Sequence, residues 1–248
     1  DGWWDKTEVP AGPHGHLWFH RRQMEAAGWR EPLDIVVAVS GASALFGYVE
    51  DGFMPKYAFH RVGVAGRVTK ATGFGYEWVR YQDVDDAWRI LKESVDAGKP
   101  VSAAHVEDVL FAGYQDAVAV EDRKVFAIAL EPEDYGTWWS WKQFSRWSKS
   151  EGKHNGQRLG RHTKREEAED PATVALRVMK DLVEWSQSPP ESVRKAFPKA
   201  IWGVAAITAC AEHCADIEGR KKWGFCHNLN SQWPTRKSTA AYLRKVAA

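Results

Sequence analysis

Cysteine is scarce in this 248-residue chain, and its placement is informative. The three cysteines, Cys210, Cys214 and Cys226, all lie near the C-terminal end, so no thiol nucleophile is available anywhere before residue 210. An odd number of cysteines argues against a disulfide framework and favours a reducing compartment. We therefore expect a cytoplasmic protein in which these cysteines are packing residues.

Long apolar runs and a net charge are also lacking. No run approaches the roughly 18 apolar residues of a membrane-spanning helix, and no basic, apolar and small-residue regions open the chain as in a signal peptide. The 34 basic and 33 acidic residues leave a net charge of +1. This balance gives no general attraction to nucleic acids or membranes, and we expect neither as a partner.

Three common sequence motifs of nucleotide-binding and catalytic loops are missing. No phosphate-cradling GxxxxGK[ST] segment occurs, and the glycine pair Gly73 and Gly75 lacks the third glycine of the dinucleotide-binding motif. Ser40-Gly41-Ala42-Ser43 lacks the second glycine of the serine-nucleophile elbow, so we interpret it as a packing turn at a helix end. No cofactor is expected.

Tryptophan, in contrast, is abundant. The chain has 14 tryptophans, and four of them cluster at Trp138, Trp139, Trp141 and Trp147. Large aromatic side chains are buried more often than they form exposed ligand platforms, which favours core packing. A Trp-lined ligand cleft is the alternative.

The pattern of apolar residues indicates a mixed chain. An amphipathic helix is expected at 84–97, with acidic residues at its start and Gly98 beyond its end. A first helix is expected at 14–27, followed by Gly28, and short strands and bends at 57–80. Further strands are expected at 100–104, 109–114 and 124–132, and further helices at 141–147, 172–186, 201–218 and 238–247. This order of elements predicts an α+β fold.

Residues 148–170 are polar and have no apolar periodicity, which predicts an exposed loop or linker. Acidic residues follow its basic cluster closely, which indicates a solvated surface rather than an anion site. The cluster consists of Arg158, Arg161, His162, Lys164 and Arg165. The expected organisation is thus a core at 1–147, a linker at 148–170 and a helical region at 171–248 that packs on the core.

The order of these segments resembles the butirosin-biosynthesis-H-like proteins, a branch of the papain-like, bacteriocin-peptidase-type cysteine hydrolases. The resemblance covers most of the chain. It is carried by the helix that ends at Gly28 and by segments 37–48, 93–101, 109–116, 128–132, 139–144, 201–216 and 239–247. It implies a papain-like fold, with the N-terminal helix packed on a small antiparallel sheet and a helical C-terminal region. It also implies a relation to enzymes of acyl transfer or amide hydrolysis.

The resemblance further implies where a catalytic triad would lie. The nucleophilic cysteine would stand at the start of the first helix, which falls near Gly15 or His16. Counting back from Gly113 and Tyr114, the histidine position falls near Glu107 or Asp108, and the orienting position before Pro132 is Glu131. The nucleophile and the histidine have therefore both changed type.

The candidate site consists of His16, His105, Glu107, Asp108 and Glu131, with His14 and His20 close by in the sequence. Two carboxylates and a histidine can perform general acid and base catalysis when burial separates their pKa values. His16 and His20 also stand four residues apart on one helix face, which suits two metal ligands of a metal-dependent hydrolase. A zinc set of Cys210, Cys214, Cys226 and His227 is disfavoured, because its first pair is helical.

Two functions remain open. One is an enzyme or former enzyme of papain-like fold, possessing no thiol chemistry, that acts on a small molecule or a carrier-linked acyl group. The other is a non-catalytic protein that binds such a ligand in a Trp-lined cleft. The absence of cysteine from the first helix favours the second.

Overall fold

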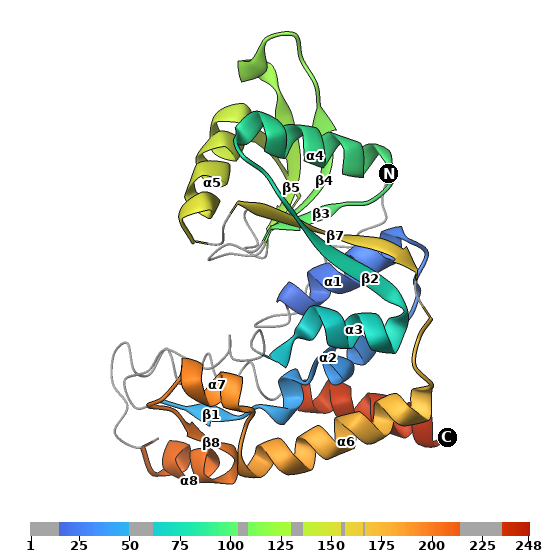
Figure 1. The fold of residues 1–248 in the computed structure, drawn as a ribbon, viewed down its shortest axis with the longest axis vertical. Coiled ribbons are helices and arrows are strands. Elements are labelled where there is room, and N and C mark those ends of the chain that lie inside the picture. The colour runs from blue at the N-terminus through green and yellow to red at the C-terminus, as the bar shows by residue number, and fades with distance from the viewer. Residues whose placement is uncertain are drawn as a thin grey trace. The chain divides into compact units, whose positions relative to one another are not determined.

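Figure 1 shows the chain in a computed structural model, which describes residues 15–49, 62–103, 109–129, 136–154, 157–165, 167–213 and 235–248. Helices and antiparallel strands are mixed, so the predicted α+β class is confirmed. The chain divides into two compact units. The sheet unit contains Trp18–Arg30 and Phe74–Arg165, and the helical unit contains Glu31–Gly73 and Glu166–Ala248. The units are discontinuous, unlike the sequential division expected above.

The sheet unit is built on six strands in the order β2-β7-β3-β4-β5-β6, in which every neighbouring pair is antiparallel. The strands are β2 (Phe74–Arg80), β3 (Val101–Ala103), β4 (Val109–Gln115), β5 (Lys124–Ala129), β6 (Thr137–Ser140) and β7 (Arg158–Arg165). The predicted strands at 100–104, 109–114 and 124–132 are β3, β4 and β5.

One face of this sheet carries the main apolar core. Val101 and Phe111 lie directly opposite each other on neighbouring antiparallel strands, so their side chains point to the same face of the sheet. There they pack against helices α4 (Val84–Asp96) and α5 (Trp141–His154), which Figure 1 shows beside the strands. Trp147 is buried in this core and Trp139 and Trp141 pack against it, whereas Trp138 is 46% exposed. The tryptophan cluster is therefore mainly a packing feature, as predicted.

Helix α4 follows from local signals. The Asp83 carboxylate accepts a hydrogen bond from the Asp86 N–H at 2.8 Å, which satisfies one of the donors left free at a helix start. Ala87 and Leu91 are fully buried and lie four residues apart on the face toward the sheet. Beyond the helix, Gly98 has φ 71°, a conformation that glycine adopts without strain. The predicted helix at 84–97 is confirmed.

The opposite face of the sheet is covered by helix α1 (Gly15–Ala26), which confirms the predicted first helix. The Gln23 side-chain amide donates to the Pro100 and Gly160 carbonyls at 3.0 and 2.8 Å. These contacts fix the described part of α1 over β7 and over Pro100, the residue before β3.

The prediction of an exposed loop or linker at 148–170 is wrong. Helix α5 continues to His154, and β7 fills 158–165 between β2 and β3. Strand β7 lacks an apolar alternation because Gly160 and His162 face α1, while Arg161 pairs with Glu77 of β2 at 2.7 Å. His162, expected on a solvated surface, is only 2% exposed.

The helical unit begins with α2 (Leu33–Ser40), whose four residues 36–39 are fully buried. Gly41 ends it with φ 83° and lies so close to Trp185 that a Cβ atom would be 2.9 Å from the indole. The Ser40–Ser43 segment is thus a packing turn, as predicted. Within the predicted strand region 57–80, Val64–Thr72 instead forms helix α3, because the buried residues Val64, Val68 and Thr72 recur every four positions.

The remaining elements of this unit are mainly helical. They are η2 (Ala42–Ala44), β1 (Gly47–Tyr48), α6 (Pro171–Gln187), α7 (Glu191–Ala196), β8 (Ile201–Trp202), α8 (Gly203–His213) and a last helix at 235–247. The Thr239 hydroxyl donates to Ser43 Oγ at 2.7 Å and anchors the last helix. Cys210 packs with Tyr48 and Ala206, as expected of a packing cysteine. No helix in the described residues is both long and apolar enough to cross a membrane.

Candidate functional site

A buried polar cluster lies between α1 and the sheet. His20 and Gln23 come from α1, and Tyr76, Ser102 and His162 come from β2, β3 and β7. His20, Gln23 and His162 are each 2% exposed, and Ser102 is 5% exposed. Buried polar groups are costly unless they are hydrogen-bonded, so the pairing within this cluster determines whether it stabilises the unit.

The two histidines contact each other directly. His20 Nδ1 lies 3.4 Å from His162 Nε2, and His162 Nδ1 lies 3.0 Å from the Gly75 carbonyl oxygen. A carbonyl only accepts, so we assign the Nδ1 proton to His162, which leaves its Nε2 to accept from His20. Burial lowers the pKa of His162 from 6.5 to about 4. His162 is therefore neutral at neutral pH.

The other polar members bond to one another and to the backbone. Tyr76 Oη and Ser102 Oγ are 2.8 Å apart, and the Ser102 hydroxyl donates to the Gly160 carbonyl at 3.3 Å. Gln23 donates to the same carbonyl. The close approach of these groups requires glycine at position 160. The described hydrogen bonds of this cluster run between its own side chains or to backbone carbonyls. The cluster therefore suits fixing α1 on the sheet better than transferring a proton to a ligand.

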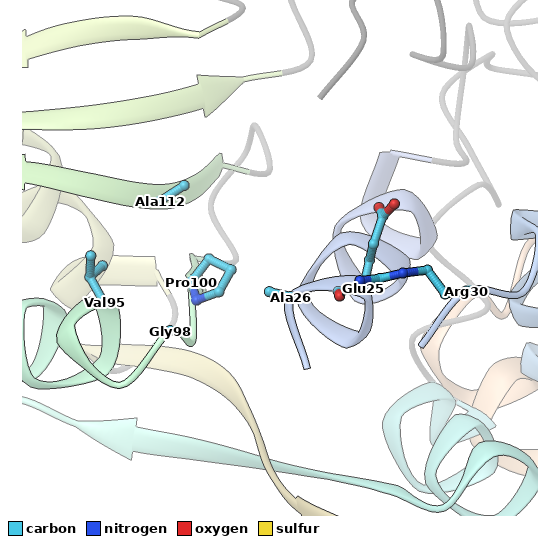
Figure 2. A pocket seen from close by; sticks show the side chains of 7 residues that line it. All are labelled: Glu25, Ala26, Arg30, Val95, Gly98, Pro100 and Ala112. Atoms are coloured by element: carbon cyan, nitrogen blue, oxygen red, sulfur yellow. Dashed lines mark hydrogen bonds between the residues drawn. The ribbon is translucent and has the colours of Figure 1, made fainter. Parts of the chain in front are cut away.

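A pocket of about 600 Å³ opens at the C-terminal end of α1. Figure 2 shows its two sides: Val95, Gly98, Pro100 and Ala112 come from α4, β4 and the turn before β3, and Glu25, Ala26 and Arg30 come from the end of α1 and the residues after it. Its volume lies in the range of small-molecule sites. Apolar walls with few polar groups are typical of such sites.

The two charged residues of the pocket have defined roles at the helix end. Arg30 Nη1 donates to the carbonyls of Glu25 and Trp29 at 2.6 and 3.1 Å, which caps the end of α1. The remaining nitrogens of this guanidinium, Nη2 and Nε, carry three further N–H groups. The Glu25 carboxylate accepts from Arg22 at 2.7 Å. The rim can therefore offer donors to an anionic or carbonyl group of a ligand.

Most of the predicted site lies outside the described residues. This holds for His14, His105, Glu107, Asp108 and Glu131, while His16 lies in α1 but its side chain is not described. The described residues next to these positions are close together, because Val109 pairs with both Ala103 and Ala129. The convergence of the predicted catalytic groups remains a prediction.

Metal binding has no support within the described ranges. No group of three or more His, Cys, Asp or Glu side chains there is arranged to hold an ion. Three of the four residues in the zinc set considered above, Cys214, Cys226 and His227, lie outside those ranges.

Sequence reasoning missed His162, Tyr76 and Ser102 as partners of α1. Tyr76 is part of a run in which Tyr76 and Trp78 alternate with Glu77 and Val79, a period-two signal of β2. The pairing with β7 and β3 is long-range, and no local signal indicates it.

Comparison of the chain with protein-family models, curated proteins and solved structures returned no match.

Proposed function

We propose that this chain is a papain-like-fold protein without thiol chemistry that binds a small acyl-bearing molecule in the pocket at the end of α1. The papain-like assignment rests on the order of the sequence segments. It is supported by an N-terminal helix packed on an antiparallel sheet. The absence of cysteine before residue 210 argues against an acyl-thiol intermediate on α1.

The pocket is the observation that carries the proposal. Ala26, Val95, Pro100 and Ala112 give it apolar walls, which suit a short acyl chain. Arg30 holds its guanidinium at the rim through two backbone carbonyls, so it is preorganised before a ligand arrives. A free carboxylate or a thioester carbonyl would meet its N–H groups, and charge-assisted hydrogen bonds favour the carboxylate.

Calorimetric titration with two probes tests this function. The probes are hexanoate, which carries a free carboxylate, and the N-acetylcysteamine thioester of hexanoate, which mimics a carrier-linked acyl group. Ala26→Trp fills the pocket from an exposed position. Ala27→Trp, one residue further and also exposed, does not line the pocket and is the matched control.

We expect at least one probe to bind the native chain and to lose about tenfold or more of its affinity in Ala26→Trp, but not in Ala27→Trp. Arg30→Ala should weaken hexanoate more than the thioester, since it removes a charged donor. Failure of both probes to bind, or equal binding by the two tryptophan variants, would contradict the proposal.

A further inference from the structure

The contact between His20 and His162 joins two elements that only the fold brings together. His20 belongs to α1 and His162 to β7, and both rings are almost completely buried. The Tyr76 ring of β2 lies 4.7 Å from the His20 ring and 5.1 Å from the His162 ring, measured between centroids. The Phe74 ring also packs edge-on against His162 at 6.4 Å. The pair is therefore enclosed by aromatic surface.

This arrangement favours neutral imidazoles, because burial outweighs the hydrogen bonds that backbone groups offer to a charged ring. With Nδ1 of His162 donating to Gly75, a proton on its Nε2 would face the Nδ1–H of His20. His20 can change tautomer once to accept that proton, which leaves a cation that is almost completely buried. A second proton on the pair would place two donors, both charged, against each other.

Two carboxylates described on the neighbouring elements are paired with arginines. On α1, Arg21 and Arg22 both pair with Glu25, at 3.8 and 2.7 Å. On β2, Glu77 pairs with Arg161 on the opposite face of the sheet. The titratable side chain that faces the pair from β2 is Tyr76, and β3 presents the neutral Ser102.

The causes of the His162 pKa shift agree with this picture. The pKa falls to about 4 because desolvation outweighs the hydrogen bonds to the backbone of Gly75, Phe74 and His20, which act to raise it, and no charged side chain contributes. The imidazole regains its ordinary pKa near 6.5 once it is exposed to water.

We propose that the His20–His162 pair is an acid-sensitive contact that holds α1 on β2 and β7 at neutral pH and releases the helix locally on acidification. The direction follows from proton linkage. A histidine with a depressed pKa in the closed state binds more protons in the open state, so closure is fully favoured above pH 6.5 and weakens as the pH falls toward 4. Over that interval the open-to-closed ratio should rise on the order of 10²-fold.

Hydrogen exchange detected by mass spectrometry tests this inference on the full chain. Protection factors, corrected for the pH dependence of intrinsic exchange, are compared for residues 18–26 of α1 and for β4 and β5 at pH 7, 6, 5 and 4.5. We expect α1 to lose at least tenfold protection while β4 and β5 keep theirs. His162→Gln retains an N–H for Gly75 and an acceptor for His20 but cannot take up a proton, so its α1 protection should stay nearly constant with pH.

Two further measurements keep the inference falsifiable if that variant folds poorly. His20→Gln should reduce the pH response in the same way, and imidazole NMR of the native chain should show His162 neutral down to about pH 5. Protection of α1 that does not change with pH, simultaneous opening of α1 and the sheet, or a His162 titration near pH 6.5 would each overturn it. None of these readouts depends on a ligand.

Discussion

Tyr76 occupies the space in which residue 160 would carry a side chain: a Cβ atom on Gly160 would lie 1.8 Å from Tyr76 Oη. The two residues belong to the neighbouring strands β2 and β7. Their contact brings the tyrosine hydroxyl to Ser102 beneath α1. The polar cluster therefore depends on one position that has no side chain.

Gly160→Ala should destabilise the sheet unit by about 1–3 kcal/mol, because overpacking forces neighbouring atoms to shift. Urea denaturation measures the loss. In a Tyr76→Ala background the cost of the same substitution should shrink, since the clashing ring is gone. Gly66→Ala is the matched control: it is exposed within α3 and has nothing within 4 Å of the new Cβ, so it should be neutral or stabilising.

Gln23→Leu should cost the sheet unit about 1–3 kcal/mol. The substitution removes the side-chain donor to the Pro100 carbonyl and one of two side-chain donors to the Gly160 carbonyl, and buried acceptors that lose partners are expensive. Gln115→Leu, at the exposed end of β4, is the control and should change the free energy of unfolding by less than about 0.5 kcal/mol. Equal effects of the two substitutions would show that Gln23 does not fix α1.

Arg67→Leu should destabilise the helical unit by about 3 kcal/mol, because it leaves the buried Asp181 carboxylate without its ion-pair partner. Arg67 also donates to the Val39 carbonyl and lies over the Trp185 ring at 5.2 Å. The double variant Arg67→Leu with Asp181→Leu should recover part of the loss. If the double variant is as unstable as the single one, packing of Arg67 outweighs the ion pair.

The Arg67→Leu defect should also depend on pH. Burial raises the pKa of Asp181 in the folded chain, and Arg67 partly opposes this shift. A carboxyl whose folded pKa is raised takes up a proton more readily when folded, so acidification toward that pKa favours the folded state. Thermal unfolding at pH 7 and pH 5 should therefore show a smaller difference between variant and native chain at the lower pH. A larger difference at pH 5 would contradict this sign.

Phe111→Ala should cost about 3–5 kcal/mol, because Phe111 is fully buried and contacts three aromatic rings. Its ring centroid lies 5.6 Å from Trp139, 5.5 Å from Phe144 and 4.9 Å from Trp147. Val118→Ala, at a fully exposed position, should have almost no effect on the free energy of unfolding. A small loss for Phe111→Ala would argue against the tryptophan cluster as core.

The elements that could be predicted from the sequence are those with local causes. Helix α4 carries its own cap at Asp83, an apolar stripe and a terminal glycine, and the short strands β3, β4 and β5 are apolar runs between turns. Strand β7 has no such pattern, because its inward residues Gly160 and His162 are small or polar and its buried contacts come from distant segments. Residue propensities alone cannot predict a strand that is stabilised mainly by contacts with segments distant in the sequence.

The same reason limits the prediction of the site. The sequence relates His20 only to its neighbours along the chain, whereas its partner His162 lies 142 residues away. The pocket combines the ends of α1 and α4 with β4, and none of its residues forms a sequence motif. The resemblance to papain-like proteins directs attention to Glu107 and Glu131, which lie outside the described residues.

Binding of a small acyl-bearing molecule in the pocket at the end of α1 is the central claim, and native mass spectrometry of the full chain incubated with hexanoate and with its N-acetylcysteamine thioester tests it most directly. The account predicts a non-covalent complex with one molecule of at least one probe per chain, which Ala26→Trp abolishes and Ala27→Trp retains. No complex with either probe, or a covalent hexanoyl adduct on the protein, would contradict it.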